Sequence, residues 1–400
     1  MVGNERQIAI GVPKESYPGE RRVAVIPEVV PLLAKEEVNT FVEAGAGAAC
    51  GFSDDTYRDK GAQIISSREQ LFQSCDMILQ VRAVGANSEA GKADLRLFRS
   101  GQIIIGHFEP LSLPQVIQQI APLGVTTFAI ELLPRITRAQ GMDALSSMAT
   151  VSGYKAVLLA AEVSRKMFPL LMTAAGTVSP AHVFVIGAGV AGLQAIATAR
   201  RLGAVVQAYD IRPAVKEQVE SLGAKFVELE LEAKDAEDKG GYARAMDEEF
   251  YRRQRELMAN VMAASDVVIT TAAVPGKKPP ILITEKMVKR MSPGSVIVDL
   301  AAERGGNCEL TRPGETVEAN GVTILGPLNL PATVPYHASQ MYSRNMLAFV
   351  RHLLHNGGME PNLDDEIIRE TMLTHKGEVI NRQVRELLGL KEIPHEVAKE

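Results

Sequence analysis

Residues 182–212 read HVFVIGAGVAGLQAIATARRLGAVVQAYDIR, and this stretch decides the fold of the chain. An apolar, β-branched run at 183–186 leads into the pattern G-x-G-x-x-G, formed by Gly187, Gly189 and Gly192. The first glycine allows a tight turn out of a strand. The second lets the backbone approach a pyrophosphate, because no Cβ intervenes, and the third lets a helix pack closely on the strand. The spacing therefore predicts a strand, a phosphate-binding turn and the start of a helix.

The second half of this stretch predicts a helix at 193–202 and a strand at 205–209 that ends in Asp210. The helix N-terminus would supply unpaired N–H groups to phosphates, and Asp210 would accept hydrogen bonds from a ribose diol. Asp210 favours NAD over NADP, whereas Arg212 is a residue type that accepts the extra phosphate of NADP. The alternative is a glycine-rich helix entry that serves packing alone. The candidate cofactor-binding residues are Gly187, Ala188, Gly189, Val190, Gly192, Asp210, Ile211 and Arg212, with Thr271 and Ala272 after a later strand.

The composition is typical of a globular α/β protein with two domains. The 400 residues are 46% hydrophobic and 23% charged, which is enough for two cores. A net charge of −5 argues against a nucleic-acid partner. Cys50, Cys75 and Cys308 form no disulfide framework, as in a reducing compartment. With no signal-peptide pattern and no apolar run of roughly 18 residues, we expect no direct membrane insertion.

The N-terminal third of the chain alternates short apolar runs with helical patterns, which predicts a parallel sheet without a glycine-rich turn. Strands are expected at 8–12, 40–43, 62–65, 77–81, 102–107 and 126–132. Helices are expected at 27–35, 55–59, 67–73 and 114–121.

The region that follows predicts another sheet of the same kind. Beyond residue 210, helices are expected at 214–222, 248–264 and 285–291, and strands at 225–230, 266–271, 295–300 and 322–326. The charged segment 230–249 contains Tyr242 and is typical either of a mobile lid or of a solvated excursion. A long helix at 335–355 and the tail are expected to return to the first domain. The predicted domains are 1–135 with 340–400, and 147–335.

The segment between the two regions, 133–150, carries four polar residues that are candidates for a ligand site. These are Arg135, Gln140, Asp143 and Ser146, placed where ligands often bind between domains. An alternative for Arg135 and Asp143 is a surface ion pair. Ser146 or Ser147 is expected to cap the helix that follows.

Other polar residues are weaker candidates. His352 and His355 stand three apart on a helix, but no third ligand accompanies them, so no metal site is expected. His107 and Glu303 follow predicted strands, at the sheet edge where α/β proteins bind ligands.

Several motifs resemble the NAD(H)-binding alpha-1 subunit family of proton-translocating NAD(P) transhydrogenases, which is related to alanine dehydrogenase. They are PKESYPGERRVAVIPE (13–28), ELLPRITRAQGMDALSS (131–147), the stretch that contains the glycine turn, GGYARAMDEEF (240–250) and PGSVIVDLAAERGGNCEL (293–310). The resemblance implies an α/β protein with two doubly wound, Rossmann-like parallel-sheet domains separated by a cleft that holds NAD(H).

The resemblance also implies roles for single residues. Asp143 and Ser146 would hold the nicotinamide carboxamide, and Arg135 would lie beside the ring. Gln140 would lie near the face that docks the NADP(H)-binding subunit. Tyr242 would close over the nucleotide. Arg135, Gln140 and Asp143 are therefore the catalytic candidates.

The implied activity is hydride transfer from NADH to NADP⁺ on a partner subunit, coupled to proton translocation by separate membrane-spanning subunits. The chain would be a homodimer, cytoplasmic and peripheral at the inner face of the membrane. Relatives that oxidise alanine use an Arg, a Lys, a His and a late acidic residue. Here Arg22 and His107 fit, but Arg82 replaces the Lys and Glu303 an Asp. Arginine stays protonated, which disfavours that reaction. An amino-acid dehydrogenase and a non-catalytic NAD sensor remain the alternatives.

Overall fold

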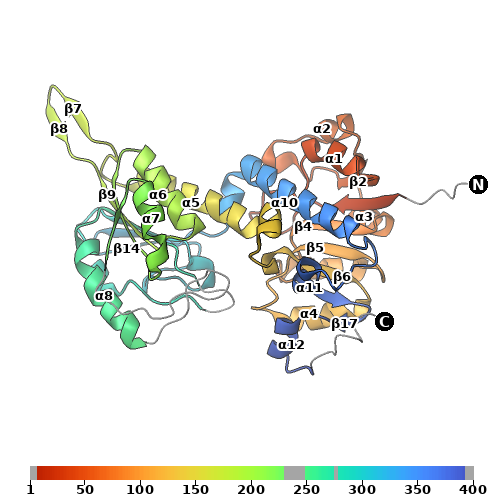
Figure 1. Cartoon of the computed structure of the whole chain (residues 1–400). Coiled ribbons are helices and arrows are strands. Elements are labelled where there is room, and N and C mark those ends of the chain that lie inside the picture. Colours follow the sequence, from red (N-terminus) through yellow and green to blue (C-terminus); the bar gives the residue numbers. More distant parts are fainter. Residues whose placement is uncertain (1–6, 229–247, 274–277, 392–400) are drawn as a thin grey trace, which may run out of the picture. The chain divides into compact units, whose positions relative to one another are not determined.

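The computed structural model describes residues 7–228, 248–273 and 278–391. The chain forms two compact units (Figure 1). The first unit comprises Met1–Met148 and Ala332–Glu400, and the second comprises Ala149–Pro331. The helix α5, Ala144–Val163, begins in the first unit and continues into the second.

The first unit is built on an eight-stranded sheet with the order β17-β16-β6-β5-β4-β1-β2-β3. Its strands are β1 (Ile8–Val12), β2 (Val38–Glu43), β3 (Gln63–Ile65), β4 (Met77–Arg82), β5 (Ile103–His107), β6 (Thr126–Ala129), β16 (Met372–His375) and β17 (Glu378–Val379). The strands β1 to β6 run parallel, as their buried apolar runs predict. The strands β16 and β17 are antiparallel additions from the tail. Strand order reverses between β1 and β4, so a ligand crevice is expected at their carboxyl ends.

Helices complete the first unit. The α-helices are α1 (Val30–Ala34), α2 (Asp54–Asp59), α3 (Arg68–Ser74), α4 (Pro114–Ile120), α10 (Pro335–His355), α11 (Glu366–Thr371) and α12 (Arg382–Leu387). The 3-10 turns are η1 (Pro27–Val29), η2 (Ala48–Cys50), η3 (Ala90–Leu97), η4 (Ala121–Leu123), η5 (Ile130–Leu132) and η6 (Thr137–Met142). The hydroxyls of Ser339 and Ser343 on α10 accept hydrogen bonds from the backbone N–H groups of Val23 and Ile26, at 3.1 and 3.0 Å. The helix α10 thus holds the loop that follows β1.

The second unit is built on a seven-stranded sheet with the order β11-β10-β9-β12-β13-β15-β14. Its strands are β9 (His182–Ile186), β10 (Val205–Tyr209), β11 (Lys225–Phe226), β12 (Val267–Thr270), β13 (Val296–Asp299), β14 (Thr316–Ala319) and β15 (Val322–Leu325). All neighbours run parallel except β14 with β15. Its helices and 3-10 turns include α6 (Val190–Arg201), α7 (Lys216–Ser221), α8 (Glu248–Ala263), α9 (Glu285–Val288), η7 (Pro213–Val215) and η8 (Ala302–Arg304). The turn η9 (Leu330–Thr333) lies where the chain passes from the second unit back to the first. The predicted α/β fold class is confirmed in both units.

Elements differ from the expectations in several places. The helix expected at 193–202 begins at Val190, immediately after the glycine turn. The strand expected at 126–132 ends at Ala129, and Ile130–Leu132 forms a 3-10 turn. A hairpin not foreseen in the sequence, β7 (Leu171–Thr173) with β8 (Gly176–Val178), extends away from the second unit's sheet (Figure 1). The ends of a strand and the position of a hairpin depend on contacts with residues far away in the sequence. The pattern of neighbouring residues does not contain this information.

The helix α5 has the length and composition of a membrane span, with a mean hydropathy of 1.2. Core helices of globular proteins share these properties. In the second unit, Ala156, Val157 and Ala160 of α5 lie in the same apolar core as strands β9 and β12. This packing accounts for the apolar residues on one face of α5.

Candidate functional site

The glycine turn of the second unit joins β9 to α6. Gly187 has φ of +94°, a left-handed conformation that favours glycine. Its N–H donates to the carbonyl of Tyr209 at 2.8 Å, and its carbonyl accepts from the Thr271 hydroxyl at 3.0 Å. The turn is therefore held from β10 on one side and from the end of β12 on the other.

The other two glycines differ in what a side chain would meet. A Cβ on Gly192 would lie 1.8 Å from the carbonyl oxygen of Gly187, so only glycine allows α6 to approach the strand this closely. A Cβ on Gly189 would meet no protein atom within 4 Å. Gly189 has φ of −76° and ψ of −167°, and no side chain caps the first turn of α6. Protein packing therefore explains Gly192, whereas no protein contact requires a glycine at position 189.

Asp210 follows β10, and its carboxylate is bound by groups of the protein itself. Oδ2 accepts from the Ala188 N–H at 2.7 Å and from Arg212 Nη2 at 2.9 Å. Oδ1 accepts from Arg212 N and Nε, both at 2.9 Å. A carboxylate offers about four acceptor positions. A ribose diol at Asp210 would therefore displace a side-chain N–H of Arg212.

The remaining candidates of the second unit lie close to this turn. Val190 is the first residue of α6 and is 38% exposed. Ile211 is partly buried against an apolar cluster that contains Tyr209. Thr271 contacts Gly187, and Ala272 is partly buried beside it. The turn, the end of β10 and the end of β12 thus form one continuous edge.

In the first unit, Arg135, Gln140, Asp143 and Ser146 lie along the segment that leads through η6 into α5. Arg135 and Gln140 are exposed. The η6 turn is fastened to α10 by Asn345, whose Nδ2 donates to the Gly141 carbonyl at 2.9 Å. The exposed side chains therefore stand on a fixed backbone.

Asp143, rather than Ser146 or Ser147, caps α5. The Asp143 carboxylate accepts from the backbone N–H of Ser146 at 2.8 Å and from its hydroxyl at 2.5 Å. The expected cap is wrong because the helix begins at Ala144, two residues before Ser146. An aspartate at this position also complements the positive end of the helix dipole. Asp143 and Ser146 form one hydrogen-bonded pair.

The predicted lid and the histidine pair of α10 are further candidates. Tyr242 and most of the predicted lid lie outside the described residues. His352 Nε2 lies 2.8 Å from Asp365 Oδ1, and His355 Nε2 lies 3.3 Å from Glu36 Oε2. Within 7–228, 248–273 and 278–391, no three His, Cys, Asp or Glu side chains gather as metal ligands.

A cluster of charges lies in the first unit around the carboxyl ends of β1, β4 and β5, where strand order reverses. Glu20 accepts from Arg22 Nε at 2.8 Å and Nη2 at 2.6 Å, and from Arg82 Nε at 3.3 Å. His107 Nδ1 lies 3.4 Å from Glu131 Oε2. A substrate carboxylate entering here would compete with Glu20 for both arginines.

Glu15 belongs to the same cluster. Its two carboxylate oxygens accept the N–H groups of Val81 and Arg82 at 2.6 and 3.1 Å. Burial, and next the charge of Glu20, raise the pKa of Glu15 to about 8. Sequence reasoning found Arg22, Arg82 and His107 but not the three glutamates. The three glutamates follow strands β1 and β6, and this position at the carboxyl ends of parallel strands was the sequence signal that could have identified them.

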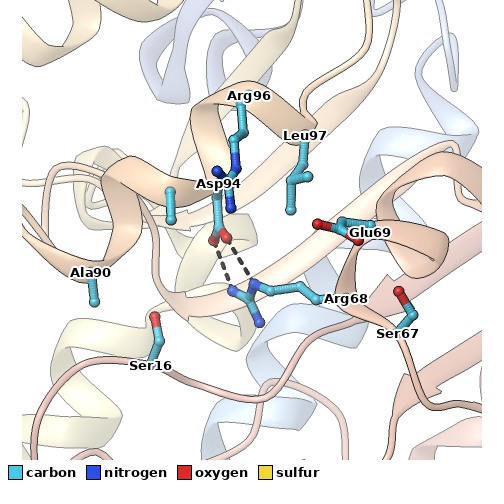
Figure 2. Close-up of a pocket in the computed structure, with 9 residues that line it drawn as sticks. Ser16, Ser67, Arg68, Glu69, Ala90, Asp94, Arg96 and Leu97 are labelled. Carbon is cyan, nitrogen blue, oxygen red and sulfur yellow. Dashed lines mark hydrogen bonds and ion pairs between the residues drawn. The ribbon is translucent and has the colours of Figure 1, made fainter.

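A hollow of about 340 Å³ lies nearby, lined by Ser16, Arg68 and Asp94 among others (Figure 2). Arg68 Nε and Nη2 each donate to Asp94 at 2.7 Å, and Nη1 donates to Glu43 at 2.8 Å. Two carboxylates thus already bind this guanidinium, which ties η3 to α3. We interpret the hollow as structural.

These features define an α/β protein of two parallel-dominated units with a glycine turn of the dinucleotide-binding type. Family models for "Alanine dehydrogenase/PNT, N-terminal domain" and "Alanine dehydrogenase/PNT, C-terminal domain" match residues 11–152 and 156–382. The chain belongs to this alanine dehydrogenase/PNT family.

Individual relatives are similar over almost the whole chain. A relative from Rhodospirillum rubrum, named as the first part of NAD(P) transhydrogenase subunit alpha, is 44% identical over 375 residues, covering 93% of this chain and 97% of the relative. A transhydrogenase structure from Sinorhizobium meliloti is 41% identical with a TM-score of 0.81, over 94% and 99% of the two chains. The alanine dehydrogenase of Bacillus subtilis is 28% identical over 97% of each chain. The chain therefore resembles the transhydrogenase branch more than this alanine dehydrogenase.

Proposed function

We propose that this chain is the NAD(H)-binding subunit of a proton-translocating NAD(P) transhydrogenase. It passes a hydride from NADH to NADP⁺ bound on a partner subunit, and separate membrane subunits couple the transfer to proton movement. The match to the Rhodospirillum rubrum subunit along 97% of that protein's length carries the proposal. The open Gly189 at the start of α6 supports the NAD(H) site.

The chemistry fits the residues present. One C–H bond of NADH breaks and one forms on NADP⁺, so two electrons and a proton move together as hydride, and no acid or base is needed at the reacting carbons. The protein has to fix the ring and let the second nucleotide approach to about 3–3.5 Å. In this proposal Arg135, Asp143 and Ser146 hold the nicotinamide end, and Gln140 aligns it with the partner. Tyr242 closes over the nucleotide.

The proposal includes a homodimer that sits at the cytoplasmic face of the membrane through its partner subunits. The hairpin β7–β8 supports a protein partner. Leu170, Met172 and Val178 are 54, 75 and 40% exposed, and no charged residue occurs between Met167 and Ala181. Apolar side chains concentrated on a projecting arm are typical of an interface.

The deciding experiment mixes the purified chain with the NADP(H)-binding subunit and follows reduction of an NADP⁺ analogue by NADH. The chain alone should bind NADH with little turnover, and the mixture should transfer hydride. Intact NADH binding without transfer in the mixture would favour a non-catalytic NAD sensor.

A second function has one observation in its favour. Arg22 and His107, the two residues that fit the pattern of an amino-acid dehydrogenase, lie in one charged cluster of the first unit, where Arg82 stands in place of the expected Lys. The same preparation should therefore be assayed with alanine and NAD⁺. Alanine-dependent NADH formation by the isolated chain would replace the transhydrogenase proposal.

A further inference from the structure

Asn307 is fully buried, and its side chain joins two stretches of chain beyond β12. Its Nδ2 donates to the carbonyls of Ala272 and Pro280, at 2.9 and 3.0 Å. Its Oδ1 accepts from the hydroxyl of Thr270. Carbonyl oxygens can only accept, so these partners fix the orientation of the amide. Asn307 therefore ties together the residues that leave β12 and those that lead toward α9.

The main chain of Asn307 is held just as firmly. Its N–H donates to Asp299 Oδ2 at 2.7 Å, and its carbonyl accepts from the N–H groups of Leu282 and Ile283 at 2.8 and 3.0 Å. Gly306 has φ of +84°, and a Cβ there would lie 2.6 Å from Asp299 Oδ2. The backbone of Asn307 is thus bound to the end of β13, while its side chain is bound to the end of β12.

The sheet order shows which half of a dinucleotide would lie near Asn307. The strands β10 and β12 flank β9 on opposite sides. Asp210, the candidate ribose ligand, follows β10, and Thr271 follows β12. A dinucleotide with its diphosphate on the turn after β9 and its adenosine over β10 has its nicotinamide half over β12.

We propose that Asn307 is a positioning residue for the nicotinamide half of NAD(H), an inference that rests on the function proposed above. Asn307 holds the carbonyl of Ala272, and this fixes the neighbouring Thr271, whose hydroxyl bonds to Gly187. The end of β12 is thereby kept in register with the phosphate turn. The adenosine side of the turn is held independently, by Tyr209 and Asp210.

The test compares two nucleotides on the intact chain. NADH spans both sides of β9, whereas 5′-AMP reaches only the turn and β10. In Asn307→Ala, three buried side-chain hydrogen bonds are lost, two of them to Thr270 and Ala272 at the end of β12. The dissociation constant of NADH should therefore rise about tenfold. The constant for 5′-AMP should stay within about twofold of the wild type. Fluorescence titration and calorimetry measure both values.

Two further variants distinguish a specific effect on NADH binding from a general loss of stability. Thr270→Val is nearly isosteric and removes only the hydroxyl that orients Oδ1, so it should weaken NADH binding in the same direction by less. Asn381→Ala is the matched control. Asn381 is also buried, in the first unit, and its Nδ2 donates to the Glu370 carbonyl at 2.9 Å. This control should lower stability in urea without changing either dissociation constant.

The possible outcomes separate the two proposals. Equal weakening of NADH and 5′-AMP in Asn307→Ala, or no weakening of NADH in both site variants, would overturn the positioning role while wild-type binding upheld the NAD(H) site. Failure of the wild-type chain to bind NADH would instead overturn the proposed function, and with it this inference. Weaker binding of NADH with unchanged binding of 5′-AMP in Asn307→Ala supports both the positioning role and the NAD(H) site.

Discussion

Replacing Gly189 or Gly192 by alanine should separate ligand binding from packing within one turn. The two positions are three residues apart and receive the same methyl group. At Gly189 the new Cβ has no protein neighbour within 4 Å, whereas at Gly192 it would lie 1.8 Å from the Gly187 carbonyl oxygen. Gly189→Ala therefore places a methyl group in the space outside the turn, whereas Gly192→Ala places it against the backbone of the turn itself.

The expected stabilities follow from these contacts. For Gly192→Ala, the higher helix propensity of alanine contributes about 1 kcal/mol. The overlap with backbone costs about 2–3 kcal/mol, the upper part of the usual range, because neither β9 nor α6 can yield easily. We expect a net loss of about 1–2 kcal/mol. For Gly189→Ala the backbone angles suit alanine, so stability should stay the same or rise by about 0.5 kcal/mol through the unfolded state.

Gly189→Ala, which should leave stability nearly unchanged, is expected to weaken NADH binding. In Gly189→Ala the methyl group occupies the approach of the diphosphate, and the dissociation constant should rise at least about tenfold, or about 1.4 kcal/mol. Urea denaturation gives the stabilities, and quenching or enhancement of NADH fluorescence gives the affinities. A Gly189→Ala protein that binds NADH as tightly as wild type would refute the assignment of this turn to the diphosphate. A Gly192→Ala protein of undiminished stability would refute the packing argument.

Three further predictions concern the first unit and the hairpin. Gln140→Asn should slow hydride transfer in the reconstituted complex by about tenfold or more while NADH affinity stays nearly constant, because a shorter side chain disturbs alignment of the rings; equal losses in both would contradict that role. Glu15 has its pKa raised to about 8, so the folded state keeps a proton that the unfolded chain loses near its usual pKa of 4.5. The free energy of unfolding should therefore fall as pH rises between these values, by at most about 5 kcal/mol. Urea titrations at about pH 5 and pH 8 should show a smaller decline in Glu15→Gln, and unchanged pH dependence would count against burial of a neutral carboxyl. Met172→Lys should shift the chain toward monomer in sedimentation at micromolar concentration, since a charge on the hairpin opposes its burial; an unaltered mass would exclude this arm from the interface.

Much of the fold was predictable because it depends on local periodicity. The run 205–209 forms β10 with the predicted limits, and the pattern at 335–355 forms α10. The glycine spacing likewise predicted a strand, a turn and a helix, which are β9, the Gly187 turn and α6. Each of these signals lies within a few residues of the structure it specifies.

The candidate site was predictable only to a degree. The residues around the glycine turn were identified by spacing, but their hydrogen bonds were not. The sequence predicts Asp210 as a ribose ligand and Arg212 as a residue type that accepts the extra phosphate of NADP, each without reference to the other. In the structure the two form one ion pair with Oδ1···Nε of 2.9 Å. Similarly, Asp143 was considered as a ligand residue, and it also caps α5.

By itself the sequence determined the α/β class, the glycine turn and the strand–helix order, because backbone sterics and apolar periodicity act between near neighbours. Only the tertiary structure decided that Asn307 ties Ala272 to Pro280, and that Glu20 binds both Arg22 and Arg82. Most of these partners are many residues apart along the chain. Their pairing depends on which strand ends the sheet order brings together, and a pattern of single residues carries no record of that order.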